Sequence, residues 1–359
     1  MRICYLADGN SQHTKKWCEY FSKHNNQVYL ISLNKVNYEF ANVKVINLGY
    51  EIGNETSISK VKYLKQISKI KSIVNEIKPD FVHAHYASSY GLLGSIINYH
   101  PYIISMWGSD IFDFPNKNIV TKSILKYNFR CADYLFSTSK VMAKEASKYT
   151  SKSISVTPFG INLNEFKPAL DIESNSKLVI GINKSLEKIY GIEYLIEGFY
   201  KISNEYPNVI LKILGDGSYR NHLCNLVKNY KLDNRVVFYG RLEKKELIKE
   251  LQTFDVAVYP SLKESFGVAV LEAQACSIPV IVSDEGGLLE TTLPGKSSLV
   301  VKKCDSTDIA DKLKFLLSNA EARANMGKTG MNFVKESFDL ENNFYNINNL
   351  YRDIVKSKG

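Results

Sequence analysis

Short apolar, β-branched segments alternate with longer helix-like segments along the whole of this 359-residue chain. Such alternation joins parallel strands through crossover helices, which then cover both faces of a sheet. The pattern breaks near residues 162–176, where Pro168 and a polar run separate two sets of strands. The sequence therefore predicts an α/β fold with two Rossmann-like, doubly wound domains. The predicted strands are Arg2–Ala7, Gln27–Ser32, Val43–Leu48, Phe81–His85, Tyr102–Met106, Tyr134–Thr138 and Ile154–Thr157 in the first set, and Leu178–Asn183, Val209–Gly215, Val236–Tyr239, Asp255–Pro260, Pro279–Ser283 and Ser298–Val301 in the second.

The length of the chain also requires more than one domain, because a single hydrophobic core rarely organises so many residues. We predict a first Rossmann-like domain over residues 1–165 and a second over residues 166–340. The remaining segment, 341–359, contains a helix-like stretch at Asn342–Lys356 that is rich in phenylalanine and tyrosine.

The composition favours a soluble globular protein of the cytoplasm. Apolar residues make up 45% of the chain and charged residues 23%. No apolar run approaches the roughly 18–20 residues that span a bilayer, and Asp8 comes too early for a signal peptide. The six cysteines lack C-x-x-C spacing, which argues against both a zinc site and a disulfide framework.

The net charge of +9 is concentrated in the first half of the chain. Residues 1–165 carry 20 Lys and Arg against 12 Asp and Glu, whereas residues 166–359 carry 26 against 25. The densest basic stretch is Ser59–Lys78, where lysines are interleaved with apolar residues at helical spacing. It is either a packed surface helix with a solvated lysine face or a contact for anionic lipid headgroups at the inner face of the membrane. No recognition motif accompanies the lysines, so nucleic acid is not an expected partner.

The stretch 260–290, PSLKESFGVAVLEAQACSIPVIVSDEGGLLE, is the most informative about function. Glu264 lies in a turn between a predicted buried strand and a predicted helix that begins at Gly267, and Glu272 lies inside that helix. The start of a helix favours phosphate oxygens. A carboxylate two turns later can accept hydrogen bonds from a sugar diol instead. Together these features predict a nucleotide-sugar site, whereas solvated surface glutamates would leave Phe266 and the Gly286-Gly287 pair unexplained.

This stretch resembles the E-x7-E motif of retaining glycosyltransferases with the GT-B fold, specifically family 4. The resemblance extends to Pro260-Ser261, Phe266-Gly267, Leu271-Glu272-Ala273, Pro279-Val280 and Gly286-Gly287. It implies two Rossmann-like domains facing across a cleft, with the segment 341–359 crossing back to the first domain. It also implies a nucleoside-diphosphate sugar as co-substrate, with no other cofactor and no metal.

The resemblance assigns donor-binding roles in this turn. Glu272 would bind the ribose hydroxyls, and Glu264 would hold the donor sugar beside the breaking bond. The segment Ser265–Val268, which includes Phe266 and Gly267, would present backbone N–H groups to the diphosphate. Gly267 would allow close approach of the backbone, because a side chain there could block it.

The family supplies positive charge for the departing diphosphate from an Arg-x5-Lys-Gly stretch. Here Lys184 stands at the arginine position, and Gly191 aligns with the glycine. Tyr190 occupies the usual lysine position, and Lys188 comes two residues early, so we expect Lys188 to supply the second cation.

Three further residues lie in loops that follow predicted strands. Gly215 belongs to a G-x-G turn whose expected role is fold geometry with a donor contact, and Arg241 would border the nucleobase. Gly9, in the first loop of the chain, matches a family position close to the diphosphate.

The expected acceptor cleft involves His13, His85 and Trp107. His13 begins a helix, and His85 ends the fourth strand; no third ligand accompanies His83 and His85, which argues against a metal. The segment from Ser105 to Asp110 resembles a family segment in which histidine stands where this chain has Trp107. Trp107 could stack on a sugar ring, and Asp110 is the nearest charged candidate for a catalytic role.

The predicted reaction is transfer of a sugar from a nucleoside-diphosphate sugar, with UDP-sugars favoured, and with retention at the anomeric carbon. The acceptor would be a glycan or a lipid-linked hydroxyl in cell-surface polysaccharide or glycolipid assembly. A classical glycosidase needs two carboxylates that flank the scissile bond, which Glu272 cannot provide while it binds ribose. Two alternatives remain: a nucleotide-sugar 2-epimerase of the same architecture, and a catalytically silent GT-B partner subunit.

Overall fold

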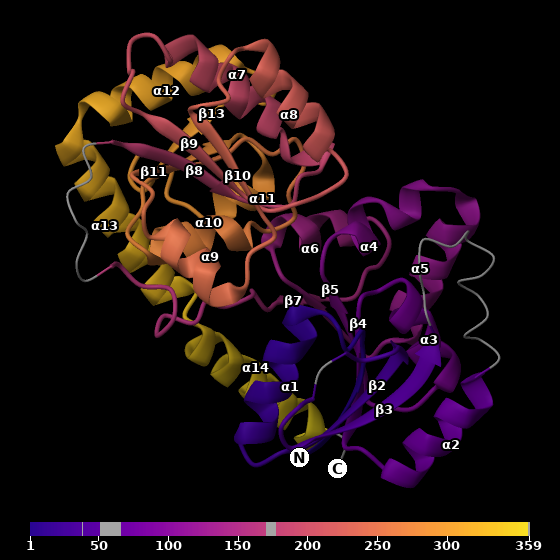
Figure 1. The fold of residues 1–359 in the computed structure, drawn as a ribbon. Coiled ribbons are helices and arrows are strands. Elements are labelled where there is room, and N and C mark those ends of the chain that lie inside the picture. Colours follow the sequence, from indigo (N-terminus) through magenta and orange to yellow (C-terminus); the bar gives the residue numbers. More distant parts are fainter. Residues whose placement is uncertain (38, 51–65, 170–176, 358–359) are drawn as a thin grey trace. The chain divides into compact units, whose positions relative to one another are not determined.

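The computed structural model describes residues 1–37, 39–50, 66–169 and 177–357 (Figure 1). The chain forms two compact units. The first unit comprises Met1–Phe159 together with Asn342–Gly359, and the second comprises Gly160–Glu341. The predicted boundary at residue 165 therefore lies slightly inside the second unit. Most of the predicted lysine-rich stretch Ser59–Lys78 lies outside the described residues; its described part is 66–78.

The first unit is built on a seven-stranded parallel sheet with the order β3-β2-β1-β4-β5-β6-β7. Every residue of its two central strands β4 and β5 is buried, as expected for a sheet covered on both faces. The order reverses between β1 and β4, which makes their carboxyl ends a switch point where ligands can bind. The strands are β1 (Arg2–Leu6), β2 (Gln27–Asn34), β3 (Val43–Tyr50), β4 (Phe81–His85), β5 (Tyr102–Met106), β6 (Tyr134–Ser137) and β7 (Ile154–Val156).

Helices α1 (Gln12–Lys23) and α2 (Ile67–Ile77) of the first unit are amphipathic and each buries one apolar face, whereas most residues of α3 (Ser89–Ile97) are buried. Helix α14 (Leu340–Lys356) packs on this unit through aromatic side chains. The fully buried Tyr351 forms a hydrogen bond of 2.6 Å with His83 Nδ1, and the Phe344 ring meets Trp17 edge-on at 5.4 Å. The other helices are α4 (Ser109–Phe112), α5 (Ile119–Cys131) and α6 (Lys140–Ala146), with a 3-10 turn, η2, at Phe114–Asn116.

The second unit repeats this plan around a six-stranded parallel sheet with the order β10-β9-β8-β11-β12-β13. Its order reverses between β8 and β11, both of which are buried throughout. The strands are β8 (Val179–Asn183), β9 (Ile210–Leu214), β10 (Val236–Gly240), β11 (Val256–Tyr259), β12 (Val280–Ser283) and β13 (Ser298–Val301).

The helices of the second unit run from the 3-10 helix η3 to helix α13. They are η3 (Lys188–Tyr190), α7 (Ile192–Ile202), α8 (Arg220–Asn229), α9 (Lys244–Leu251), α10 (Val268–Ala275), α11 (Gly286–Glu290), α12 (Ser306–Ser318) and α13 (Ala320–Ser337).

Each strand predicted from the sequence has a counterpart in these sheets, which confirms the α/β class with two Rossmann-like units. Within the described ranges, no helix is both long and apolar enough to cross a membrane.

Candidate functional site

The second unit places Glu272 at the switch point of its sheet. Asn183 ends strand β8, and its Nδ2 donates a hydrogen bond of 2.9 Å to Glu272 Oε2. The Tyr259 hydroxyl donates to Asn183 Oδ1 at 2.5 Å. Burial and the nearby Glu272 raise the pKa of Tyr259 well above its usual range, so the hydroxyl keeps its proton. The amide is thereby held in the orientation that donates to the carboxylate.

Glu264 is paired with Lys184 in the same region. Lys184 Nζ lies 2.5 Å from Glu264 Oε2, and the two side chains are 15% and 11% exposed. The ring of Tyr190 covers the ammonium, with 4.3 Å between the nitrogen and the ring centroid. The structure therefore brings together Lys184, the predicted cation, and Glu264, the predicted sugar-binding carboxylate. Tyr190, which occupies the usual lysine position of the family, contacts Lys184 with its aromatic ring.

The loop that carries Lys184 is pressed against the turn that carries Glu264. Leu262 donates a backbone hydrogen bond of 2.8 Å to Ile189 O. Gly191 has φ +62°, and a Cβ there would lie 2.2 Å from Pro260 O. Close contact between these segments brings the lysine and the glutamate within ion-pair distance.

The G-x-G turn at residues 215–217 also packs against the loop that carries Lys184. A Cβ on Gly215 would lie 2.0 Å from Lys184 O, and one on Gly217 would lie 2.4 Å from Leu186 O. These close contacts agree with the role in fold geometry that was predicted for this turn. The Lys184 carbonyl occupies the space beside the Gly215 Cα, so a donor has no room to contact this Cα directly.

The structure gives a reason for Gly267 that the sequence did not predict. Gly267 has φ +101°, and a Cβ there would lie 3.0 Å from Thr291 Oγ1 and 3.1 Å from Leu288 Cδ2. Backbone conformation and packing on the α11 region thus already favour glycine, and the close approach of a ligand to this position stays a prediction. The Phe266 side chain is also part of the core, with its ring edge-on to Phe338 at 5.7 Å, so only its backbone could meet a donor.

Gly287 brings helix α11 onto the Glu264 turn. A Cβ on Gly287 would lie 2.3 Å from Glu264 O and 2.7 Å from Phe266 N. The Gly286-Gly287 part of the sequence motif thus holds the turn that carries Glu264 in place. Helix α10 begins at Val268 beside this contact, and the first N–H groups of any α-helix lack intrahelical acceptors. Ser265 and Val268, the other predicted donor residues, are both half-buried here.

Two of the predicted site residues, the second cation and the residue expected to border the nucleobase, lie on the surface. Lys188 is exposed on η3, and Arg241 is exposed directly after β10. In the described parts of the chain, neither has an ion pair with Glu264 or Glu272, so both roles stay predictions.

The first unit brings His13, His85 and Trp107 together in one aromatic cluster. His13 stacks on Phe159 with 3.9 Å between ring centroids and 9° between planes. Trp107 lies 5.7 Å from the His13 ring and 4.6 Å from the His85 ring. Trp107 and His13 are half-buried, whereas His85 is only 1% exposed. The prediction that His85 lines an open cleft was therefore wrong, because Trp107 and its neighbours bury it.

Both of the cluster's histidines are neutral. Burial lowers the pKa of His13 and of His85 to about 3. His83 is a structural residue, because its two ring nitrogens bond to the Tyr351 hydroxyl and to Ser105 Oγ at 2.6 Å and 2.7 Å. Across the described residues, no group of His, Cys, Asp and Glu side chains could hold a metal.

Asp110 was wrongly predicted to be catalytic. It is fully buried, and its carboxylate accepts backbone hydrogen bonds from Ala87 at 2.7 Å, Gly108 at 2.8 Å and Trp107 at 3.2 Å. Burial raises the pKa of Asp110, and these bonds oppose that rise. The side chain fixes the loop after β5 and has no access to a substrate.

The contact predicted for Gly9 also differs. Its backbone N–H donates to Ser32 Oγ at 3.1 Å, and a Cβ would lie 2.5 Å from Val36 Cγ2. Gly9 therefore closes the first loop onto the loop after β2, and its N–H is not available to a diphosphate.

Asn183 is the functional candidate that sequence reasoning missed. The only signal was a polar residue at the end of the otherwise apolar strand 178–183. Its partner Tyr259 ends β11 in the same way.

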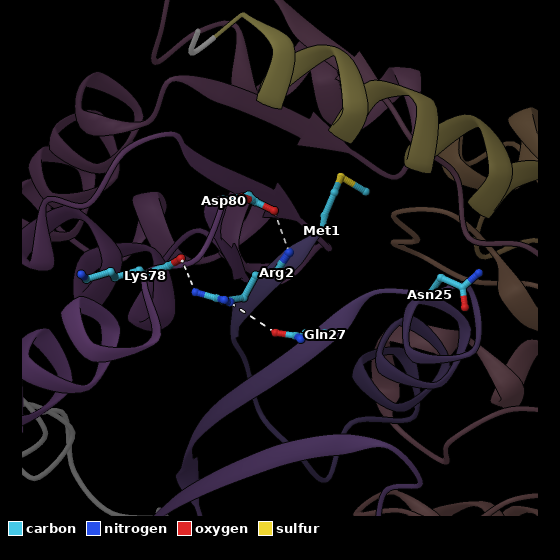
Figure 2. Close-up of a pocket in the computed structure, with 6 residues that line it drawn as sticks. All are labelled: Met1, Arg2, Asn25, Gln27, Lys78 and Asp80. Atoms are coloured by element: carbon cyan, nitrogen blue, oxygen red, sulfur yellow. Dashed lines mark hydrogen bonds between the residues drawn. The ribbon is translucent and has the colours of Figure 1, made fainter.

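A shallow hollow in the first unit lies away from these residues (Figure 2). Its volume is about 380 Å³. Arg2, which begins β1, crosses it and is held by Gln27 Oε1 at 3.3 Å and the Lys78 carbonyl at 3.2 Å. Ligands of parallel sheets bind at carboxyl ends, whereas this hollow lies at an amino end, so it is not the candidate site. Its lining residues are Met1, Arg2, Asn25, Gln27, Lys78 and Asp80.

Two parallel α/β units, the second with Glu264 and Glu272 at the switch point of its sheet, are typical of GT-B glycosyltransferases. The model of the "Glycosyl transferase 4-like" family matches residues 2–139, and the model of "Glycosyl transferases group 1" matches residues 164–333. The chain belongs to the group 1 glycosyltransferases of the GT-B fold.

Curated relatives and a solved structure agree with this assignment. The chain is 25% identical to N-acetyl-α-D-glucosaminyl L-malate synthase of Bacillus anthracis, over 80% of this chain and 78% of the relative. It is also 25% identical to the N,N'-diacetylbacillosaminyl-diphospho-undecaprenol α-1,3-N-acetylgalactosaminyltransferase of Campylobacter jejuni, over 77% of each chain. The fold is similar to that of sucrose-phosphate synthase from Thermosynechococcus elongatus, with a TM-score of 0.86 and 20% identity over 99% of this chain and 100% of the other.

Proposed function

We propose that this chain transfers a sugar from a nucleoside-diphosphate sugar, with UDP-sugars favoured, to a hydroxyl of a glycan or lipid-linked acceptor, with retention at the anomeric carbon. One observation carries the proposal. Glu272, oriented by Asn183, lies on the helix that starts beside the Lys184–Glu264 pair, at the switch point of the second sheet. This arrangement offers acceptors for a diol and a cation for a diphosphate within one site.

Each of these groups has a distinct role in the proposed donor complex. Asn183 engages Glu272 Oε2, so the carboxylate is held in place to accept from the ribose hydroxyls. Hydrogen bonds to a charged acceptor contribute about 1.5–3 kcal/mol each. The start of α10 favours the diphosphate, and Lys184 exchanges part of its contact with Glu264 for a phosphate oxygen. Glu264 then accepts from hydroxyls of the donor sugar.

The proposed reaction breaks the bond between the anomeric carbon and the diphosphate oxygen. A bond to the acceptor oxygen forms on the same face, and the departing phosphate oxygen takes the acceptor's proton. Lys184 stabilises the negative charge that develops on the leaving group. This route needs no side-chain base, and the lysine provides the positive charge that a metal ion would otherwise supply.

The acceptor class is inferred from chemistry and from the relatives. The Campylobacter jejuni relative is named for a diphospho-undecaprenol acceptor. A lipid-linked acceptor would bring this chain to the inner face of a membrane, and the excess of basic residues in 1–165 suits anionic headgroups. We therefore place the reaction in the assembly of cell-surface polysaccharide or glycolipid.

A donor screen tests the proposal. The protein is incubated with a panel of UDP- and GDP-sugars, and the released nucleotide and the sugar are both analysed. Slow release of nucleotide from one donor, with retained configuration in any product, supports the proposal. Conversion of the sugar without nucleotide release would identify an epimerase, and no change with any donor would indicate a silent subunit.

A further inference from the structure

Tyr190 lies beside the candidate donor site but has no assigned role in the proposed reaction. It stands where the family has a lysine, and its ring covers Lys184, which stands where the family has an arginine. Both members of the family's cation pair are therefore replaced in this chain, and the two replacements contact each other. Residues in contact are the ones whose changes are coupled, so Lys184 and Tyr190 are best considered as one unit.

The backbone fixes the position of the Tyr190 ring. The N–H of Tyr190 donates to Glu187 O at 3.0 Å. Gly191, the next residue, has φ +62°, and a Cβ there would lie 2.2 Å from Pro260 O. The ring is thus anchored through its own main chain, and it can position the flexible side chain of Lys184.

Tyr190, rather than Lys188, is the residue of η3 that lies at the ion pair. Lys188 comes two residues earlier in this 3-10 helix, where three residues complete a turn, so the two side chains leave the helix on different faces. Tyr190 is half-buried, with 4.3 Å between its ring centroid and Lys184 Nζ, whereas Lys188 is exposed. The second donor for a diphosphate is therefore expected from the tyrosine.

The Tyr190 hydroxyl is available to a ligand. Among the residues that the structure describes, this hydroxyl has no hydrogen-bond partner. Burial raises the pKa of Tyr190; Lys184 opposes the rise, and Glu264 and Glu187 add to it. The phenol therefore keeps its proton at neutral pH, and a protonated phenol can donate to a phosphate oxygen.

We propose that Tyr190 takes the place of the family's second cation and binds the nucleoside diphosphate together with Lys184. The hydroxyl donates to a phosphate oxygen. The face of the ring keeps the Lys184 ammonium beside the same diphosphate when the ammonium exchanges Glu264 for phosphate. A phenol ring is shorter than a diphosphate, so one diphosphate can meet both donors. The inference rests on the proposed function, because it concerns the leaving group of the same donor.

Titration calorimetry of the full chain with UDP and with UMP tests the proposal, because the two ligands differ only in the second phosphate. GDP and GMP are titrated in the same way. We expect the wild type to bind one diphosphate more tightly than its monophosphate. Tyr190→Phe removes only the hydroxyl and should raise the Kd for the diphosphate about tenfold, with the Kd for the monophosphate unchanged. Tyr190→Leu also removes the ring and should raise the diphosphate Kd about threefold further.

A cycle of variants tests whether Tyr190 and Lys184 act as one unit. Lys184→Arg and Tyr190→Lys each break the contact between the ammonium and the ring. The double variant Lys184→Arg/Tyr190→Lys restores the two cations of the family. Its diphosphate Kd should therefore be at least about fivefold lower than the product of the two single effects predicts. Additive effects would show that the two positions act independently.

The second unit contains a matched trio for the controls. Lys212 pairs with Glu250 at 2.8 Å, and its ammonium lies 5.5 Å from the centroid of the Tyr239 ring. These residues lie on β9, α9 and β10, whereas Glu264 follows β11. Tyr239→Phe and Tyr239→Leu remove the same groups as the Tyr190 variants and should leave every Kd unchanged. Circular dichroism verifies the fold of each variant.

The outcomes separate this inference from the proposed function. A wild type that prefers the diphosphate, together with an unchanged preference in Tyr190→Phe, would overturn the inference and leave the proposed function standing. Equal weakening of diphosphate and monophosphate in Tyr190→Phe would also overturn it, since the role would then be structural. So would a loss of the preference in Lys188→Gln but not in Tyr190→Phe. A wild type that binds none of the four nucleotides would contradict the proposed function and this inference with it.

Discussion

Glu272 is held by a chain of hydrogen bonds that runs through the buried Asn183 to the Tyr259 hydroxyl. A buried polar chain is stable only when each member has a partner, so its geometry is tightly constrained. This constraint holds one carboxylate oxygen of Glu272, Oε2, against the Asn183 side chain. The residues of the site thus act in pairs, with Asn183 orienting Glu272 and Tyr190 covering Lys184.

Replacing Glu272 by alanine should weaken donor binding. Loss of one or two charged hydrogen bonds of about 1.5–3 kcal/mol each corresponds to a rise in the Kd for UDP-sugar of about 10- to 100-fold or more. Isothermal titration calorimetry measures this directly. An unchanged Kd would mean that the ribose binds elsewhere.

Glu264→Ala should behave differently, because its carboxylate is expected to act on the donor sugar beside the breaking bond. We expect kcat to fall at least about 100-fold while the Kd for the nucleotide changes little. The alanine also leaves Lys184 without its 2.5 Å partner, so Glu264→Gln is the control that keeps a hydrogen-bond acceptor. Full activity in both variants would contradict the role.

Asn183 is a positioning residue, and its replacement tests the chain behind Glu272. Asn183→Leu has similar volume but removes the donor to Oε2, so KM for the donor should rise about fivefold with a smaller change in kcat. Asn26, a half-buried asparagine of the first unit whose Nδ2 donates to Phe21 O and His24 O, provides the control Asn26→Leu. An equal fall in kcat for both variants would indicate a general loss of folding instead.

At the scale of elements, glycines decide how the loops of the second unit meet. Gly191, Gly215 and Gly287 each place a Cα where a Cβ would lie 2.0–2.3 Å from a backbone oxygen of a neighbouring loop. These contacts bring the ends of β8 and β11 and the start of α11 together. A motif that is spread over many residues in sequence therefore becomes one compact site.

Gly267→Ala should destabilise the second unit and impair the site. A side chain at φ +101° strains the backbone, and the Cβ would also lie 3.0 Å from Thr291 Oγ1. The strain alone costs about 1–3 kcal/mol. Gly295→Ala is a matched control, because Gly295 has φ +76° but no neighbour within 4 Å of the added Cβ. Denaturant unfolding should show a larger loss for Gly267→Ala; equal losses would show that packing contributes nothing.

Sequence patterns were sufficient to predict the strands and helices, but they could not predict the contacts between loops. Alternating apolar runs gave the strands because buried parallel strands are almost continuously apolar. The roles of the two glutamates and of Lys184 were predicted from the resemblance to family 4. Asp110 and His85 were assigned wrongly because burial depends on neighbours distant in sequence, such as Ala87 and Trp107. Asn183 was missed because one polar residue at a strand end carries little signal.

At the scale of the whole molecule, the two units differ in their response to acid. Burial lowers the pKa of His13 and His85 to about 3 and that of His83 well below its usual range. All three lie in the first unit. Below pH about 6.5 the unfolded chain binds a proton at each of them, whereas the folded unit does not. The free energy of unfolding is therefore greatest above that pH and falls as the pH is lowered.

The first unit should consequently lose stability before the second as pH falls from about 6.5 towards 4. Each histidine contributes a slope of about 1.4 kcal/mol per pH unit. The raised pKa of Asp110 opposes this loss, because the folded unit takes up that proton more readily than the unfolded chain. The chain contains two tryptophans, Trp17 and Trp107, and both belong to the first unit.

Tryptophan fluorescence therefore reports on the first unit alone, whereas far-ultraviolet circular dichroism reports on both. At pH 5 the fluorescence transition in urea should come at a lower concentration than the main dichroism transition, and the two should approach each other at pH 7.5. His85→Phe removes one of the three titrating groups and should reduce the pH slope of the fluorescence midpoint by about one third, since each histidine contributes about equally. Coincident transitions at both pH values would show that the units unfold together, and an unchanged slope in His85→Phe would show that this imidazole does not control acid stability.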